Sequence, residues 1–294
     1  MSHRKTTSAL GAIALAFGAA CGSSDPAGSG GEGRLSFTTW GEAYIEDAIP
    51  PDPGDGSGFI DGWTVRYDTF LVSFQNIVVA DARGDTAERM MGSALFDNEL
   101  PGVKPIVDFA AVPAQAWDRI SYEIAPVTAE TALAPGVDAA LAAAMIEAGQ
   151  SLYVAGTATK ADVQKRFAWG FAIGTRYEEC RSQQDGREQS GVVVTNNGEV
   201  VVELTTHGDH LFYDRLQASP DPAIPTSLRF DALAAADLDE DGEVTLAELL
   251  QKPLDVLSYD PSGLGAATHG AFVTALARTV GHFRGEGECT VRGL

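Results

Sequence analysis

Apolar and polar positions alternate with a period of two along most of the chain between residues 34 and 212. This period places successive side chains on opposite faces of an extended segment, so it predicts β-strands with one buried face. The alternating runs are 35–39, 63–69, 72–78, 120–124, 152–154 and 163–173. The apolar positions change from odd to even numbers near Phe70, and we therefore expect a bulge or a turn there.

The run 163–173 gives the longest strand signal. Phe167, Trp169 and Phe171 share one face with the two end residues of the run, whereas the alternate positions are small or polar. A strand with one apolar face is half-buried, which is typical of an antiparallel sheet.

Two shorter β-rich runs, 192–195 and 199–205, are separated by Asn196-Asn197-Gly198. Asn and Gly tolerate the positive φ angles of tight turns, so this turn between two strands predicts a β-hairpin. Many short strands joined by Gly- and Pro-containing turns predict a mainly β fold, either an antiparallel sandwich or a barrel-like body. We assign residues 35–222 to this β-rich domain.

Helical periodicity interrupts the strands once and returns near the C-terminus. Residues 135–148 are rich in alanine and predict a surface helix in a long connection. Residues 228–236 predict a second helix, and residues 265–283 predict a third, whose larger apolar residues recur every three or four positions. On this third helix His269 lies on the apolar stripe and is expected to pack, whereas His282 faces elsewhere.

The first twenty residues have the layout of a secretory signal peptide. Arg4 and Lys5 form a basic start, residues 8–17 are compact and apolar, and small residues precede Cys21. The apolar stretch is too short to cross a bilayer of about 30 Å, and no later segment offers about 18 consecutive apolar residues. The run ending at Cys21, Phe-Gly-Ala-Ala-Cys, resembles a lipobox of bacterial lipoproteins. The resemblance implies that Cys21 is lipidated; ordinary signal-peptidase cleavage is the alternative.

Residues 21–34 contain mostly Gly, Ser and other small residues after the cysteine. They lack side chains that could form a core, so we expect a flexible tether that holds a folded body off the membrane. Gly22 stands where an aspartate would retain a lipoprotein in the inner membrane. The lipobox resemblance therefore implies an exported, outer membrane lipoprotein, facing the periplasm or the cell surface, with the membrane as its partner.

The chain carries a net charge of −21, from 41 acidic and 20 basic residues. Such an excess argues against nucleic acid as a partner and favours the binding of cations. There are three cysteines. If Cys21 is acylated, Cys180 and Cys289 form an even pair in an oxidising compartment, which predicts a disulfide around a loop of about 110 residues. Two unpaired thiols are the alternative.

Residues 237–248 read Asp-Leu-Asp-Glu-Asp-Gly-Glu-Val-Thr-Leu-Ala-Glu. They match the calcium loop of the EF-hand family at its defining positions. The resemblance implies the ligands Asp237, Asp239, Asp241, Glu243, Thr245 and Glu248. Glu243 would contribute its backbone carbonyl and Glu248 both carboxylate oxygens, a set that favours Ca²⁺ over the smaller Mg²⁺. An acidic surface loop without tight binding is the alternative.

The sequence shows no second loop, although Val244 occupies the position that normally pairs with one. Calcium sensors use paired hands, so a single loop implies a structural role for the ion. The loop resembles the single loops of some bacterial extracellular proteins, including dockerin-like modules, which themselves carry two repeats. We assign residues 226–255 to a small helical EF-hand-like calcium segment and residues 256–294 to a C-terminal helix and tail.

A second candidate metal site is His207-Gly-Asp209-His210. Two imidazoles and a carboxylate are ligands that zinc and copper accept. Metal sites more often gather their ligands from distant segments, so a polar loop with hydrogen-bonded histidines is the alternative.

No catalytic motif stands out: the chain lacks Gly-x-Ser-x-Gly, a Gly-rich phosphate loop and His-Glu-x-x-His. The four tryptophans lie in or near alternating runs and are expected in the core rather than in a sugar groove. We expect a non-enzymatic, calcium-binding lipoprotein whose β-rich body binds or scaffolds an unknown protein or ligand. The alternatives are a zinc- or copper-binding lipoprotein that uses His207 and His210, and a hydrolase with a dispersed active site.

Overall fold

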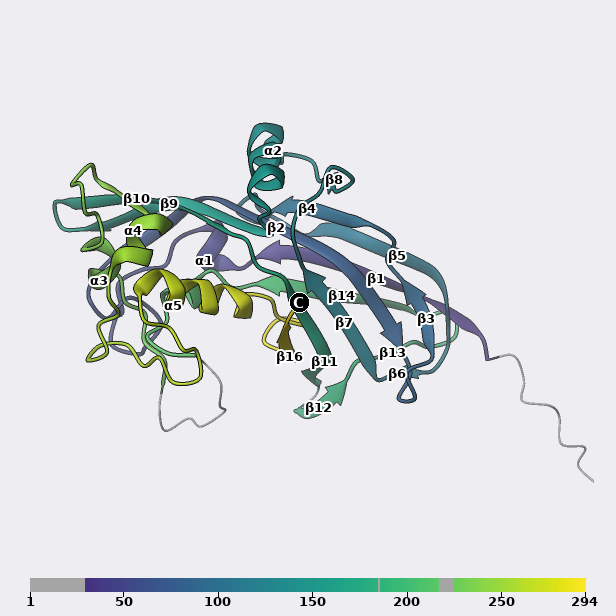
Figure 1. Ribbon diagram of the computed structural model, residues 1–294. Coiled ribbons are helices and arrows are strands. Elements are labelled where there is room, and N and C mark those ends of the chain that lie inside the picture. Colours follow the sequence, from purple (N-terminus) through teal and green to yellow (C-terminus); the bar gives the residue numbers. More distant parts are fainter. Residues whose placement is uncertain (1–29, 185, 217–224) are drawn as a thin grey trace, which may run out of the picture. The chain divides into compact units, whose positions relative to one another are not determined.

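The computed structural model describes residues 30–184, 186–216 and 225–294. Residues Gly31–Leu294 form one compact unit built mainly of β-strands, which confirms the predicted mainly β fold (Figure 1). The predicted signal peptide, Cys21 and most of the tether lie outside the described residues. Among the helices of the described ranges, none is long and apolar enough to cross a membrane.

A three-stranded sheet has β1 at its centre, with β14 parallel to β1 on one side and β5 antiparallel on the other. Its strands are β1 (Glu32–Gly41), β14 (Glu199–Thr206) and β5 (Lys104–Pro113). Alternate residues of β1 are buried, as the sequence predicts. Two residues of β13 (Val192–Val193) pair separately with β6 (Ala116–Trp117).

A larger sheet has eleven strands in the described residues and follows the order β12-β11-β7-β2-β9-β10-β15. These strands are β12 (Arg187–Ser190), β11 (Thr175–Gln184), β7 (Arg119–Ile124), β2 (Thr64–Ala80), β9 (Leu152–Lys160), β10 (Val163–Phe171) and β15 (Glu243–Thr245). Four more join it at the sides: β16 (Glu288–Gly293) on β11, β3 (Thr86–Arg89) and β4 (Ser93–Asp97) on β2, and β8 (Ala132–Leu133) on β4.

The hydrophobic core lies between these two sheets. Phe37 of β1 and Leu204 of β14 belong to the same buried cluster as Phe74 of β2 and Trp169 of β10, so the two sheets pack face to face (Figure 1). The arrangement is mixed rather than antiparallel throughout, because β1–β14, β4–β8 and β10–β15 are parallel pairs. Three of the four tryptophans are buried, and Trp40 is half-buried.

The expected irregularity near Phe70 is a bulge. β2 continues through this position as one strand, and its register against β9 shifts between Tyr67 and Thr69. The shift moves the buried side chains from odd to even positions, which is why the apolar alternation in the sequence changes there.

The predicted hairpin around Asn197 is wrong. The tight turn exists, since Asn197 has a φ of 55° and Gly198 N–H donates to Thr195 O. However, β13 pairs with β6 and β14 pairs with β1, so the strands on either side of the turn do not pair with each other. The edges of β6 and β1 provide both strands with partners from distant parts of the chain.

The helices are short. They are α1 (Ala43–Glu46), α2 (Ala139–Ala148), α3 (Asp231–Ala234), α4 (Leu246–Gln251) and α5 (His269–Leu276), with 3₁₀ turns η1 (Asp209–Phe212) and η2 (Ala277–Thr279). α2 confirms the predicted surface helix, whose N-terminus is capped by Asp138 and which ends at Gly149 in the left-handed conformation.

The third predicted helix, 265–283, is shorter than expected. α5 ends at Leu276, and after η2 the chain runs in extended form along the edge of β14. Thr206 bridges Gly281, and His282 N–H donates to Thr205 O over 2.9 Å. The backbone hydrogen bonds with the edge of β14 thus replace those that a longer helix would make. As a result, His282 does not lie on a helix, as the sequence predicted, but in an extended segment.

Candidate metal sites

The predicted calcium loop connects α3 to α4 and bends sharply in the middle. Gly242 has a φ of 84°, a conformation that a residue without a side chain adopts at little cost. This bend turns the chain so that the two ends of the loop, Asp237 and Glu248, face each other. α4 then begins at Leu246, in the position of the exiting helix of an EF-hand.

Three of the predicted ligands come together in this loop. Carboxylate oxygens of Asp237, Asp239 and Glu248 all lie within 4.8 Å of one another. The side chain of Asp237 is only 1% exposed, and its two oxygens accept hydrogen bonds from Asp241 N–H at 3.1 Å and from Gly242 N–H at 3.0 Å. The loop therefore directs three carboxylates to one small space, as a cation site requires.

Glu248 closes the loop from its far end. Its Oε1 accepts from Leu238 N–H at 2.9 Å, and its Oε2 accepts from Thr245 N–H at 2.8 Å. Thr245 caps α4 in return, since its hydroxyl accepts from Glu248 N–H, which completes a capping box. Burial acts to raise the pKa of Glu248, but these hydrogen bonds outweigh it and lower the pKa below its ordinary value. Glu248 is thus ionised at neutral pH.

The other predicted ligands lie outside this group of three. Asp241 Oδ1 accepts from Glu243 N–H at 2.7 Å, the Glu243 carboxylate lies 3.6 Å from Arg166 on the surface, and the Thr245 hydroxyl bonds to Glu248. The surface position of the Glu243 carboxylate fits the expectation that this residue would offer its backbone carbonyl.

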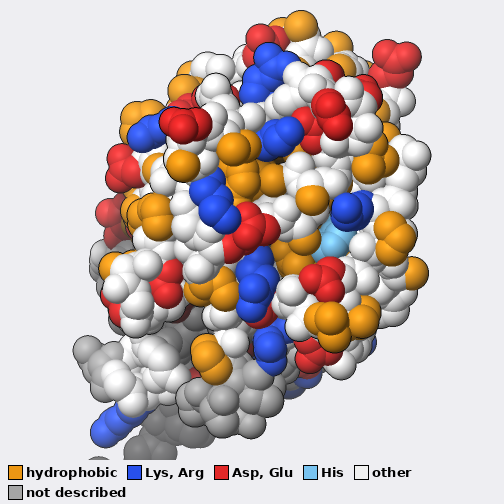
Figure 2. All heavy atoms as spheres, turned by 90° about the vertical axis from the view of Figure 1, so that its left-hand side faces the viewer, with side chains coloured by type: hydrophobic (Ala, Val, Ile, Leu, Met, Phe, Trp, Pro, Cys, Tyr) orange, Lys and Arg blue, Asp and Glu red, His pale blue; other side chains and the backbone are white. Residues whose placement is uncertain are grey.

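The loop is attached to the β-rich body through β10. β15 pairs in parallel with β10, placing Val244 opposite Phe167, and Trp169 Nε1 donates to Val244 O at 2.8 Å inside the core. The partner that a second EF-hand loop would provide is therefore a strand of the large sheet. Figure 2 views the end of the molecule that carries this segment, where acidic, basic and apolar side chains are intermixed.

Lys165 of β10 adds a charge to the loop. Its ammonium group forms an ion pair and a hydrogen bond with Asp237 Oδ2. The hydrogen bond from Lys165 is the main reason that the pKa of Asp237 lies below its ordinary value. The first predicted ligand is thus held ionised by a lysine of the neighbouring strand.

The second candidate site is brought together only in part. His207 and His210 are both buried, and their ring centres lie 5.3 Å apart. The Asp209 carboxylate is engaged with another residue: its Oδ2 accepts from the Tyr213 hydroxyl at 2.8 Å. Burial raises the pKa of Asp209 above its ordinary value. Asp209 does not belong to the group of three histidines whose nitrogens lie within 4.8 Å of one another.

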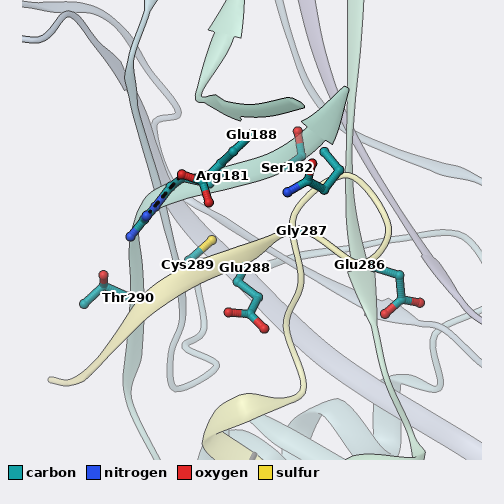
Figure 3. A pocket seen from close by; sticks show the side chains of 9 residues that line it. Arg181, Ser182, Glu188, Glu286, Gly287, Glu288, Cys289 and Thr290 are labelled. Atoms are coloured by element: carbon teal, nitrogen blue, oxygen red, sulfur yellow. Dashed lines mark hydrogen bonds and ion pairs between the residues drawn. The ribbon is translucent and has the colours of Figure 1, made fainter. Parts of the chain in front are cut away.

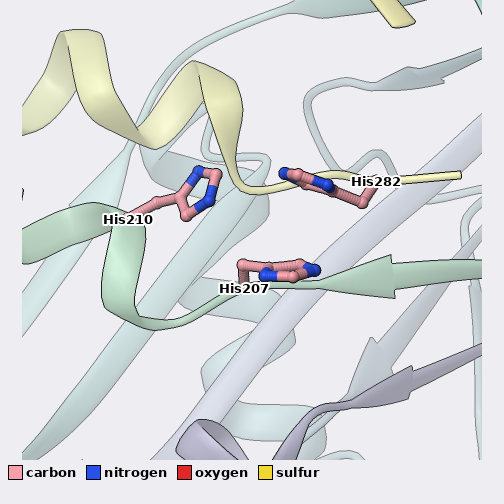
Figure 4. A group of neighbouring side chains, drawn as sticks. All are labelled: His207, His210 and His282. Carbon is pink, nitrogen blue, oxygen red and sulfur yellow. The ribbon is translucent and has the colours of Figure 1, made fainter. Parts of the chain in front are cut away.

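His282 takes the place that we predicted for Asp209. Its ring centre is 4.0 Å from that of His207 and 5.0 Å from that of His210, and nitrogen atoms of the three rings lie within 4.8 Å of one another. Figure 4 shows the three rings turned toward one another between the segment after β14 and the segment after η2. Sequence reasoning missed His282 because it assigned this residue to a helix.

The predicted disulfide between Cys180 of β11 and Cys289 of β16 is present, with an S–S distance of 2.04 Å. It borders a polar depression of about 520 Å³ whose lining includes Arg181, Ser182 and Glu188 (Figure 3). Arg181 and Glu188 form an ion pair of 3.4 Å there. Cys289 also lines a smaller cavity beside the histidines.

Comparison with known proteins gives no relative: no family profile, no curated protein and no solved structure matches this chain.

Proposed function

We propose that this chain is an exported, lipid-anchored protein whose EF-hand-like loop binds one calcium ion and thereby fastens the C-terminal segment to the β-rich body. The body then serves binding or scaffolding rather than catalysis. The observation that carries the proposal is the convergence of the Asp237, Asp239 and Glu248 carboxylates in a helix–loop–helix segment. A cation held there joins α3, the loop and α4 to β15, which is itself part of the large sheet.

The structural role follows from how the loop is attached. A regulatory EF-hand needs freedom for its exiting helix to move. Here Val244 is fully buried and its carbonyl is fixed by Trp169, so opening the loop would disrupt the core. Calcium would stabilise the folded state by binding to it alone, adding about 2.7 kcal/mol at a hundredfold excess over Kd.

Calorimetric titration of the full-length chain in mild detergent, after removal of calcium by a chelator, tests the proposal. We expect one calcium site per chain, with a Kd of about 10⁻⁴–10⁻³ M, the range of extracellular modules. Glu248→Gln should weaken binding by about tenfold or more, because it removes one charge from a bidentate ligand. Lys165→Met should strengthen binding by about fivefold, because it removes a positive charge beside Asp237.

Glu240→Gln is the matched control. Glu240 is an exposed acid of the same loop outside the ligand positions, so its neutralisation reports the effect of charge without loss of a ligand. The proposal is contradicted if the wild-type chain gives no heat of binding with millimolar calcium. It is also contradicted if Glu240→Gln weakens calcium binding as much as Glu248→Gln does.

The lipid anchor is tested separately through Cys21. In a bacterial host that processes lipoproteins, the wild-type chain should carry a diacylglyceryl group on Cys21 and sediment with outer membranes. Cys21→Ser should remove the lipid mass and release the chain from the membranes. Cys180→Ser is the control for cysteine replacement. A Cys21→Ser chain that still sediments with membranes would show that the anchor is elsewhere.

A further inference from the structure

Three histidines from two distant segments meet in one place. His207 follows β14, and His210 lies in η1 three residues later. His282 is brought beside them by the pairing of its segment with the end of β14, in which His207 N–H donates to Val280 O and His282 N–H to Thr205 O, each over 2.9 Å. The backbone thus fixes three imidazoles whose nitrogens lie within 4.8 Å of one another. Small rotations of the rings would bring them to the spacing of about 3.3 Å between ligands of one tetrahedral ion.

Hydrogen bonding prepares His210 as a ligand. Its Nδ1 lies 3.0 Å from the hydroxyl oxygen of Thr279, and that hydroxyl donates its own hydrogen to Leu276 O at 2.8 Å. The oxygen can therefore only accept from His210, which places the proton on Nδ1 and leaves the lone pair of Nε2 free. This arrangement is the usual support of a metal-binding histidine by a second group.

Glu42 plays a comparable part for His207. Its Oε1 lies 3.1 Å from His207 Nε2, the distance of an ion pair, although the atoms are not aligned for a hydrogen bond. In the neutral ring, the negative charge favours the tautomer with the proton on Nε2, which would leave the Nδ1 lone pair to bind a metal ion. Asp209 and Glu286 add further negative charge near this ring, so the surroundings favour a cation.

The three rings are packed together, with ring centres 4.0–5.3 Å apart. His282 Nδ1 is buried without a hydrogen-bond partner. Protonated imidazoles at this spacing repel one another, whereas a shared metal ion would bind their lone pairs.

A small cavity of about 90 Å³ adjoins this group. It is lined by side chains of His210, Thr279, His282 and Glu288 together with Cys289. The cavity leaves space for a water molecule or a small anion beside the rings, as at zinc sites with three protein ligands.

We propose that His207, His210 and His282 bind one divalent transition-metal ion of the class that imidazole prefers, Zn²⁺ or Cu²⁺, with an exchangeable fourth position facing the cavity. Thr279 and Glu42 are positioning residues for this centre. The site is independent of the calcium loop, since it shares no ligand with that loop.

Zinc titration of the full-length, disulfide-bonded chain at pH 7.5, with calcium present at millimolar concentration, tests the proposal. One Zn²⁺ per chain should bind. His207→Gln, His210→Gln and His282→Gln should each weaken binding by about a hundredfold or more, and Thr279→Val by about tenfold to a hundredfold. His269→Gln, which replaces a buried histidine outside the group, should leave binding unchanged, as should Glu248→Gln.

Cobalt(II) provides a second measurement that does not depend on variants folding. Co²⁺ bound to the wild-type chain should give the visible absorption of a four-coordinate site, and azide should shift this spectrum by entering the exchangeable position. The proposal is overturned if neither Zn²⁺ nor Co²⁺ binds at low micromolar concentration. It is also overturned if all three histidine variants bind zinc as strongly as the wild-type chain.

Discussion

His269 is a buried histidine whose environment keeps it neutral. Its side chain is completely buried at the start of α5, its Nε2 accepts from Asp255 N–H at 3.3 Å, and its Nδ1 has no hydrogen-bond partner. Burial lowers the pKa of His269 below its ordinary value, although the charge of Asp255 opposes this and that of Lys252 supports it. A proton on Nε2 would also break the hydrogen bond with Asp255.

This environment makes stability depend on pH. Because the pKa of His269 is lower in the folded than in the unfolded chain, its contribution is complete above the unfolded value of about 6.5 and is lost as pH falls. We expect the free energy of unfolding to decline below pH 6.5, and His269→Gln to reduce that decline by up to about 1.4 kcal/mol per pH unit. Urea unfolding of the wild-type chain and of His269→Gln, from pH 7.5 to 5 with a chelator present, measures this difference. Equal slopes of unfolding free energy against pH in the two chains would contradict the prediction.

Among the elements, β15 has only three residues, yet it attaches the predicted calcium loop to the large sheet. Its three residues connect the calcium loop to β10, and Val244 at its centre is fully buried. The candidate site could be predicted from the sequence because its residues are contiguous. The pairing of the loop with β10 could not be predicted, because β10 lies some seventy residues earlier in the chain.

Shortening Val244 tests the role of β15. Val244→Ala should reduce the free energy of unfolding by about 1–3 kcal/mol through lost burial and packing, and should also weaken calcium binding, since β15 holds the centre of the loop. Leu238→Ala is the control: Leu238 belongs to the same loop but is 51% exposed, so its loss should change stability by no more than about 0.5 kcal/mol. Denaturant unfolding with and without calcium compares the two. Similar losses for both variants would show that β15 is not a specific support.

At the scale of the whole molecule, the disulfide lies in the same region that the proposed calcium ion would fasten. Cys289 joins the last strand to β11 at a sequence separation of 109 from Cys180, and the predicted calcium loop lies within that interval. The chain entropy of a loop of this length corresponds to about 4–5 kcal/mol. Both fastenings therefore act on the C-terminal third, which consists of short helices and strands.

Removing the two fastenings should lower the melting temperature in steps. The double variant Cys180→Ala/Cys289→Ala should melt roughly 10 °C below the wild-type chain, and a calcium chelator should lower the melting temperature of either chain further. Differential scanning calorimetry measures the four combinations. If the chelator changes the melting temperature of neither chain, calcium has no structural role. If the cysteine variant melts at the same temperature as the wild-type chain, the disulfide does not stabilise the fold.

The sequence by itself determined the features that neighbouring residues specify. Alternation marked the strands and the irregularity near Phe70, the alanine-rich run 135–148 marked α2, and twelve contiguous residues predicted the calcium loop. The disulfide followed from counting cysteines. Tertiary structure alone decided the partners: β14 lies on β1 and not on β13, and His282 joins His207 because its segment pairs with β14. Local patterns fix dihedral angles and buried faces, whereas the choice among open strand edges depends on which distant segments fill the core together.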